Sequence, residues 1–143
     1  MQIKVKKLDE RAILPTRGSA MAAGMDLYAL DSASIRAGET VLVHTGIALS
    51  IPEGYAGFIY ARSGIATKRG LAPANKVGVV DADYRGEIMV ALHNHGEKTE
   101  TVDAGERVAQ MVIAPFLLPE LVLSESLDET ERADGGFGST GKK

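Results

Sequence analysis

The stretch ETVLVHTGIALSI, residues 39–51, is rich in valine, isoleucine and threonine and lies between two glycines, Gly38 and Gly54. Such a run bounded by turn residues is typical of a β-strand. Similar runs recur along the chain with glycines between them: AGFIYA (56–61), GEIMVALHN (86–94) and RVAQMVIAPF (107–116). No window has a long apolar pattern at helical period, and the best helix candidate is a single turn at 65–69. The sequence therefore predicts an all-β sandwich or barrel.

The size and composition of the chain restrict its class. Its 143 residues fit one domain with a core of its own. The absence of cysteine excludes disulfides, thiolate metal sites and a cysteine nucleophile. No apolar run is long enough to span a bilayer, and the N-terminal MQIKVKKLDE lacks the apolar segment of a signal peptide. We therefore expect a soluble cytoplasmic protein with no membrane partner.

The distribution of charge narrows the choice of ligand. A net charge of -3 argues against a protein that binds a nucleic-acid backbone. Residues 58–80 nevertheless contain four basic side chains and no acid, and carboxylates follow at once. This pattern suits either a small anionic ligand handled with a metal ion or a solvated basic turn. The residues concerned are Arg62, Lys68, Arg69 and Lys76, followed by Asp81, Asp83 and Glu87.

Two turns share one sequence pattern. Arg36-Ala-Gly-Glu and Asp103-Ala-Gly-Glu each precede an apolar run. Repeated strand–turn units of this kind are a feature of jelly rolls.

The C-terminal segment differs from the rest of the chain. Residues 124–134 are acidic without an apolar pattern, and the sequence then ends ADGGFGSTGKK. A glycine-rich tail of this kind is typical of a frayed end. Phe137 favours instead a mobile arm that closes over a flat ligand. Glycine N–H groups together with the hydroxyls of Ser139 and Thr140 could then hold phosphate oxygens.

Three short motifs carry groups suited to phosphate chemistry. In ARSGIATKRG (61–70), Arg62 offers a planar fork and Ser63 a hydroxyl, while Gly64 allows close approach of the backbone. In GVVDADYRGEI (78–88), Asp81 and Asp83 are candidate general bases. In AGMDLYA (23–29), a carboxylate stands among apolar neighbours, which predicts a metal or an ion pair at Asp26.

The histidines do not support the common hydrolase arrangements. His93 and His95 form an H-x-H pair that could bind a metal, but no third ligand is evident. The chain also shows no Ser-His-Asp pattern with a marked nucleophile. The hypothesis that remains is attack by water, with an aspartate as base and a metal-bound phosphate chain as electrophile.

Taken together and in order, these motifs resemble the homotrimeric dUTP diphosphatase (dUTPase) family over nearly the whole chain. The resemblance rests on five motifs: AGMDLYA (23–29), ARSGIA (61–66), GVVDADYRGEI (78–88), GERVAQMVIAP (105–115) and RADGGFGSTG (132–141). It implies an all-β distorted jelly roll, or β-clip barrel, over residues 1–123, and a glycine-rich C-terminal arm over residues 124–143. It also implies a homotrimer in which the arm of one chain closes the active site of another.

The resemblance further implies the reaction. The expected enzyme hydrolyses dUTP to dUMP and pyrophosphate by Mg²⁺-assisted attack of water on the α-phosphate. This supplies dUMP for thymidylate synthesis and keeps uracil out of DNA. Asp81 is the expected base, Tyr84 packs beneath the deoxyribose, and Asn75 reads the uracil edge with the backbone of residues 75–89. Val79, Val80 and Met89 line the uracil pocket.

The remaining roles implied by the resemblance concern the phosphates, the metal and the arm. The expected phosphate-binding residues are Arg62, Ser63, Gly64 and Gln110. Asp26 would hold a water molecule on the magnesium ion. The closing arm would use Arg132, Phe137, Gly138, Ser139 and Thr140, with the Phe137 ring stacked on uracil.

Two other functions compete with this interpretation. The dCTP deaminases resemble the same fold, but their chemistry needs a glutamate where this chain has Ala91. Because alanine cannot transfer protons, deamination is disfavoured. A jelly-roll binding module without catalysis is the second alternative, although it would not require Asp81, Tyr84 and the Phe137 arm together.

Overall fold

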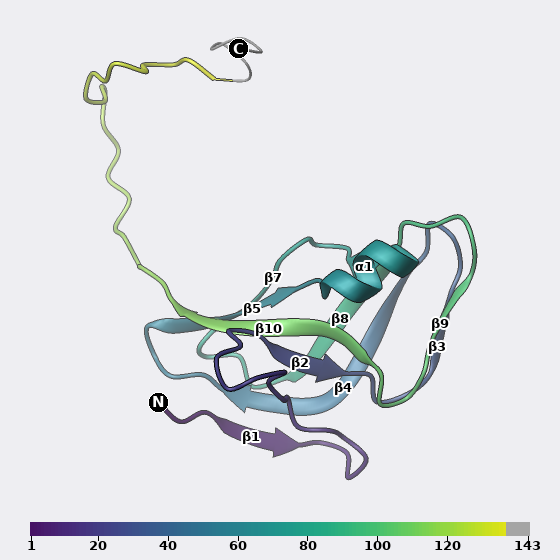
Figure 1. The fold of residues 1–143 in the computed structure, drawn as a ribbon. Helices are drawn as coiled ribbons and strands as arrows, with labels where there is room; N and C mark the ends of the chain where they lie inside the picture. The colour runs from purple at the N-terminus through teal and green to yellow at the C-terminus, as the bar shows by residue number, and fades with distance from the viewer. Residues whose placement is uncertain (137–143) are drawn as a thin grey trace.

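The computed structural model describes residues 1–136 and shows an antiparallel β-sandwich in these residues (Figure 1). One sheet has the order β1-β4-β8-β6, formed by Lys4–Lys7, Thr40–Ser50, Glu87–Asn94 and Leu71–Pro73. The other has the order β2-β10-β5-β7, formed by Met25–Tyr28, Arg107–Pro115, Tyr55–Tyr60 and Gly78–Val80. A separate ribbon pairs β3 (Ala33–Ile35) with β9 (Glu100–Val102). The predicted all-β jelly-roll class is confirmed.

Within residues 1–136, every connection between consecutive strands leads to a different sheet. The buried side chains of the two larger sheets form one core. Strand β8 shows why its sequence folds this way, because its residues alternate between half-buried and buried positions along its whole length. Ile88, Val90 and Leu92 point into the core, each no more than 1% exposed. Met89 and Ala91 therefore face outward, toward the cavity described below.

One buried polar side chain connects the ribbon to the sandwich. Asn94, at the end of β8, is fully buried. Its amide group donates to the carbonyls of Ile35 and Lys98 at 2.9 and 2.7 Å, and its oxygen accepts from the Gly96 N–H at 2.8 Å. Because every one of these groups is satisfied, burial of the amide is not a penalty here.

The repeated turn sequence has a repeated structure. In each copy the N–H of the glutamate donates to the carbonyl three residues earlier at 3.0 Å, from Glu39 to Arg36 and from Glu106 to Asp103. Each glutamate side chain also accepts from the N–H of that earlier residue. The glycines between them have positive φ angles, which explains the glycine in both copies.

The single described helix, α1 (Ser63–Arg69), is longer than the one turn predicted for residues 65–69. It begins two residues earlier because the Ala66 N–H already bonds to the Arg62 carbonyl. It ends at Gly70, which has a left-handed φ of 66° and donates to the Ala66 carbonyl. Within residues 1–136, no helix has the length and hydrophobicity of a membrane span.

Strand β4 contains a bulge that separates its two halves. Between His44↔Met89 and Ala48↔Glu87 the register shifts, so that residues 45–47 of β4 lie opposite Ile88 alone. The Gly46 carbonyl accepts from the Leu8 N–H at 2.7 Å, and the His44 carbonyl accepts from the Leu30 N–H at 2.8 Å. After β10 the chain runs away from the sheets without forming another strand up to residue 136 (Figure 1).

The bulge predicts a costly substitution at Gly46. Its φ is +69°, and an added Cβ would lie 2.9 Å from the Ala12 Cβ. We expect Gly46→Ala to lower the free energy of unfolding by about 2–4 kcal/mol, through backbone strain and overpacking together. Gly38→Ala is the control, because Gly38 has a φ of +72° and open space around it. It should cost only about 1–2 kcal/mol in the same urea titration, and equal losses would contradict this account.

Candidate active site

The hairpin that joins β7 to β8 passes from one sheet to the other and forms one wall of a half-open cavity of about 290 Å³. Six of the residues expected to bind a nucleoside or activate water line this cavity: Asn75, Val79, Val80, Asp81, Tyr84 and Met89. They come from β7, β8 and the connections beside them. The fold thus places Asn75 and Met89 beside four side chains of the 78–88 motif.

The conformation of the hairpin depends on Tyr84 and Gly86. The Tyr84 N–H donates to the Asp81 carbonyl at 3.2 Å, and its hydroxyl donates to the Glu87 carbonyl at 2.9 Å. A Cβ on Gly86 would overlap the Tyr84 ring, so only glycine fits beneath it. Within residues 1–136 the Asp81 carboxylate is exposed and accepts no hydrogen bond from the protein, which leaves both oxygens accessible to water.

Asn75 is held at the cavity by the turn after β6. The Ala74 N–H donates to the Ala91 carbonyl of β8 at 2.7 Å, which fixes this turn to the sheet. Lys76 then takes a left-handed φ of 64°, unusual for a residue other than glycine. The Asn75 side-chain nitrogen lies against Gly78, where a Cβ would come within 3.3 Å of it. Glycine at 78 therefore leaves room for the amide group that was expected to read a base.

A second cavity of about 390 Å³ gathers the groups expected to hold phosphates. Its lining includes Asp26, Arg62, Ser63, Gly64 and Gln110, all identified from sequence. No residue lines both this cavity and the hairpin cavity. In a single chain, the expected nucleoside and phosphate groups therefore lie in separate places.

Asp26 forms an ion-pair network in the second cavity. It is 9% exposed, and its two oxygens accept from Arg62 Nε at 2.7 Å and from Arg107 Nη1 at 3.3 Å. Of the two alternatives expected at Asp26, a metal or an ion pair, the structure shows the ion pair, formed with two guanidinium groups. Sequence reasoning missed Arg107, because only the pairing of β10 with β2 places it beside Asp26.

Gln110 connects three segments around the second cavity. It lies opposite Asp26 on β2 and opposite Tyr60 on β5. Its amide nitrogen donates to the Ala61 carbonyl at 2.9 Å, immediately before Arg62. A Cβ at Gly24 would collide with the Gln110 side chain, so glycine permits this close approach. Gln110 thus orients the turn that carries Arg62.

Two of the four basic side chains of residues 58–80, Arg62 and Arg69, form ion pairs. Arg62 pairs with Asp26, as described above. Arg69, at the end of α1, pairs with Glu100 at 2.7 Å and also with Glu106. Partial burial opposes the charge on Arg69, but its bonds to the two carboxylates outweigh this and raise its pKa. Arg69 therefore anchors the helix that follows Arg62. The positive charge of Arg69 is already paired with the carboxylates of Glu100 and Glu106.

Three other predicted residues within the described part of the chain, Arg132, His93 and His95, line neither cavity. The Arg132 side chain is exposed and donates to the Gly135 carbonyl at 2.8 Å. The His93 and His95 rings lie 4.4 Å apart, and His93 contacts Thr40. No cluster of three or more metal-ligating side chains occurs in residues 1–136, so these residues give the H-x-H metal site no support. Phe137, Gly138, Ser139 and Thr140 lie outside the described residues.

A family model and individual relatives all match this chain to the same kind of enzyme. A family model described as dUTPase matches residues 10–141. The deoxyuridine 5'-triphosphate nucleotidohydrolase of Hydrogenobaculum sp. (strain Y04AAS1) is 50% identical over 144 residues and is covered completely, as is this chain. The enzyme of the same name from Nautilia profundicola is 45% identical, with 99% of this chain and 100% of that protein covered.

Solved structures with the same fold are also similar in sequence. The dUTPase of Staphylococcus bacteriophage 80alpha, solved with dUpNHpp, has a TM-score of 0.88 and 29% identity, with 98% of each chain covered. A variant dUTPase from phage phi11 of S. aureus has a TM-score of 0.84 and 26% identity, with 90% of this chain and 100% of that chain covered. That structure reveals the coordination of a structural Mg(II) ion.

The ion-pair network predicts that Asp26 matters more for stability than an exposed aspartate. We expect Asp26→Asn to lower the free energy of unfolding by about 1–3 kcal/mol, because the partly buried guanidinium group of Arg62 would lose its counterion. Asp31→Asn is the matched control, since Asp31 also pairs with an arginine at 2.7 Å but is 61% exposed. Its cost should be about 0.5 kcal/mol or less in urea titrations at one protein concentration. Similar losses would show that burial of the Asp26 pair is unimportant.

Proposed function

The chain belongs to the dUTPase family and hydrolyses dUTP to dUMP and pyrophosphate, and on this premise we propose that the β7–β8 hairpin holds deoxyuridine and activates the attacking water. The observation that carries this proposal is the cavity lined by Asn75, Asp81 and Tyr84. The lining of the cavity includes the Asn75 amide group and the exposed carboxylate of Asp81.

We assign the uracil to the inner part of this cavity. Val79, Val80 and Met89 pack against the base, and Asn75 reads its edge with the backbone of residues 75–89. Bulk at the hairpin excludes the methyl group of thymine, and a backbone donor excludes cytosine by facing its amine. A site that pairs a polar edge discriminates more strongly than an apolar pocket does. Tyr84 packs beneath the sugar and leaves no room for a 2'-hydroxyl.

The chemistry assigned to Asp81 is general-base catalysis. Its carboxylate takes a proton from water as the water oxygen forms a bond to the α-phosphorus. The bond from that phosphorus to the bridging oxygen breaks, and pyrophosphate leaves. The exposure of the carboxylate and its lack of protein donors within residues 1–136 support this assignment. Arg62, Ser63, Gly64 and Gln110 hold the phosphate chain in line with the attack.

Magnesium is part of the proposal. Residues 1–136 contain no cluster of acids and histidines that could bind an ion alone, which fits an ion held mainly by triphosphate oxygens. Each Asp26 oxygen bonds one arginine and keeps a further lone pair, so Asp26 could accept from a metal-bound water. When bound, Mg²⁺ offsets the charge that develops on the phosphates.

We further propose a homotrimer with shared active sites. The separation of the two cavities in one chain supports this, because the hairpin of one subunit could meet the phosphate cavity of another. Several large apolar side chains after β10 are also at least 80% exposed, as expected for a surface that a partner covers. These residues are Leu117, Leu118, Leu121, Val122, Leu123 and Leu127.

In this assembly the two parts of the chain would have different roles. Residues 1–123 would form the β-barrel domain, and residues 124–143 would form an arm. The arm, with Arg132, Phe137, Gly138, Ser139 and Thr140, would close over the nucleotide bound by a neighbouring chain. We place the enzyme in the cytoplasm, where its product dUMP serves thymidylate synthesis and removal of dUTP keeps uracil out of DNA.

Substitution of Asp81 tests the assigned base. Asp81→Asn should lower turnover of dUTP by roughly 10²–10⁴-fold, measured as pyrophosphate release, because an amide cannot take the proton from water. Binding of dUTP, measured by calorimetry, should change little. Asp83→Asn is the control, because Asp83 is also exposed but does not line the hairpin cavity. Full turnover in Asp81→Asn would refute the assignment.

The same assay separates the enzyme from a deaminase. Purified protein with Mg²⁺ and dUTP, dCTP, dTTP or UTP should release pyrophosphate from dUTP alone, and chelation of the metal should stop the reaction. Ala91 does line the hairpin cavity but provides no acid group there. Ammonia from dCTP would overturn the reasoning based on Ala91.

The role of Tyr84 predicts a change in sugar selectivity. Tyr84→Leu should reduce the ratio of kcat/KM for dUTP over UTP by roughly 10–100-fold, because the smaller side chain leaves space for a 2'-hydroxyl. Tyr60→Leu is the matched control, since Tyr60 is a similarly exposed tyrosine that does not line the cavity. An unchanged ratio in Tyr84→Leu would show that another group excludes the ribose.

A further inference from the structure

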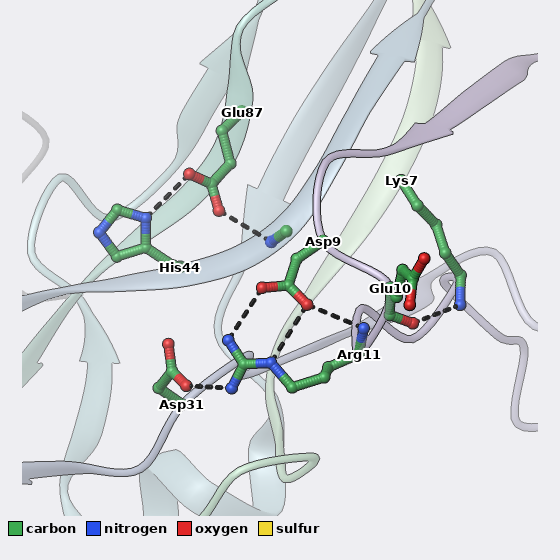
Figure 2. A network of polar contacts seen from close by, with 8 residues as sticks. Lys7, Asp9, Glu10, Arg11, Asp31, His44 and Glu87 are labelled. Atoms are coloured by element: carbon green, nitrogen blue, oxygen red, sulfur yellow. Dashed lines mark hydrogen bonds and ion pairs between the residues drawn. The ribbon is translucent and has the colours of Figure 1, made fainter.

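Glu87 connects the catalytic hairpin to the bulge of β4. It begins β8 directly after Gly86, and its side chain is 21% exposed. Its Oε1 atom accepts from the Gly46 N–H at 2.8 Å, and its Oε2 atom lies 2.8 Å from Nδ1 of His44 (Figure 2). One carboxylate thus bonds a backbone group and a side chain of the bulge at the same time.

The hydrogen bonds of Glu87 indicate the protonation state of its carboxyl group and of Nδ1 of His44. Partial burial opposes ionisation of Glu87, but the hydrogen bonds from His44 and Gly46 outweigh burial and hold its pKa below the ordinary value. The side chain is therefore a carboxylate at neutral pH. Because a carboxylate only accepts hydrogen bonds, Nδ1 of His44 carries a proton in either charge state of the ring.

The bulge is a rigid anchor for Glu87. The bonds from Leu8 and Leu30 already fix the carbonyls of Gly46 and His44. Between these residues, Thr45 is 1% exposed, and its hydroxyl donates to the Ile88 carbonyl at 2.5 Å. Side-chain bonds between β4 and β8 thus replace the backbone ladder that the bulge interrupts.

On its other side, Glu87 bonds the residue assigned to the sugar. Its carbonyl accepts from the Tyr84 hydroxyl at 2.9 Å, and the Tyr84 ring lies over Gly86 between them. Any shift of the Glu87 backbone would therefore move the Tyr84 ring. A continuous path of contacts runs from the core through the bulge and Glu87 to Tyr84.

We propose that Glu87 is a positioning residue for sugar selectivity, which fixes the Tyr84 ring by binding the β4 bulge through Gly46 and His44. This inference rests on the proposed role of Tyr84. Glutamine at this position would preserve both contacts, because its oxygen accepts from Gly46 and its amide donates to Nδ1 of the neutral His44 ring once the ring proton is on Nε2. Alanine would preserve neither, and aspartate is shorter by one methylene group.

The test compares kcat/KM for dUTP and for UTP in variants of the full chain with Mg²⁺. Glu87→Ala should lower the ratio of dUTP to UTP by about tenfold or more, and Glu87→Gln should keep it within about twofold. Glu39→Ala is the matched control, since Glu39 also accepts a backbone N–H beside β4 but lies in the turn before that strand. Its ratio should not change. If Glu87→Ala does not fold, Glu87→Asp serves in its place with the same expected loss.

A double-mutant cycle tests whether Glu87 acts through Tyr84. Tyr84→Phe removes only the hydroxyl that bonds the Glu87 carbonyl, so its effect and that of Glu87→Ala should not add in the double variant. Additive effects, an unchanged ratio in Glu87→Ala, or an equal fall in Glu39→Ala would each overturn the proposal.

If Tyr84→Leu itself leaves the ratio unchanged, the assignment of Tyr84 fails, and the proposal for Glu87 fails with it. If Tyr84→Leu changes the ratio and Glu87→Ala does not, only the proposal for Glu87 is refuted.

Discussion

The pairing of β4 with β8 is the constraint on which the rest of the structure depends. These two long strands occupy the centre of one sheet, and β8 places its alternate residues in the core shared with the other sheet. The same strand continues from the β7–β8 hairpin, so the position of that hairpin follows from the packing of β8. The hairpin is therefore connected directly to the core through β8.

The sequence predicted those parts of the fold that follow from local patterns. The four longest strands were located to within one or two residues because runs of β-branched residues end at turn residues. The helix was underestimated because its first turn begins at Ser63, where no capping side chain marks the start. The bulge at residues 44–48 depends on tertiary bonds from Leu8 and Leu30, which no local pattern encodes.

In the candidate site, too, some features follow from local sequence patterns and others depend on tertiary contacts. Asp81 and Tyr84 share a cavity with Asn75, as their motifs indicated. Arg107 and Glu87 acquire their importance only through strand register, which places one beside Asp26 and the other beside Gly46. Length and spacing along the chain do not determine which residues of two distant strands lie opposite each other.

The arrangement of Arg62, Asp26 and Arg107 has a consequence for how a phosphate chain would bind at the phosphate site that we propose. Two guanidinium groups share one carboxylate, so the group carries a net positive charge while its arginines are already oriented. Arginines without a partner lose side-chain entropy when they bind a ligand. Arg62 and Arg107 have already lost this entropy on folding, through their pairing with Asp26. The reorganisation energy of the site is correspondingly small, because its dipoles need not turn as negative charge arrives. The buried Asp26 carboxylate thus orients two cationic side chains before a ligand binds.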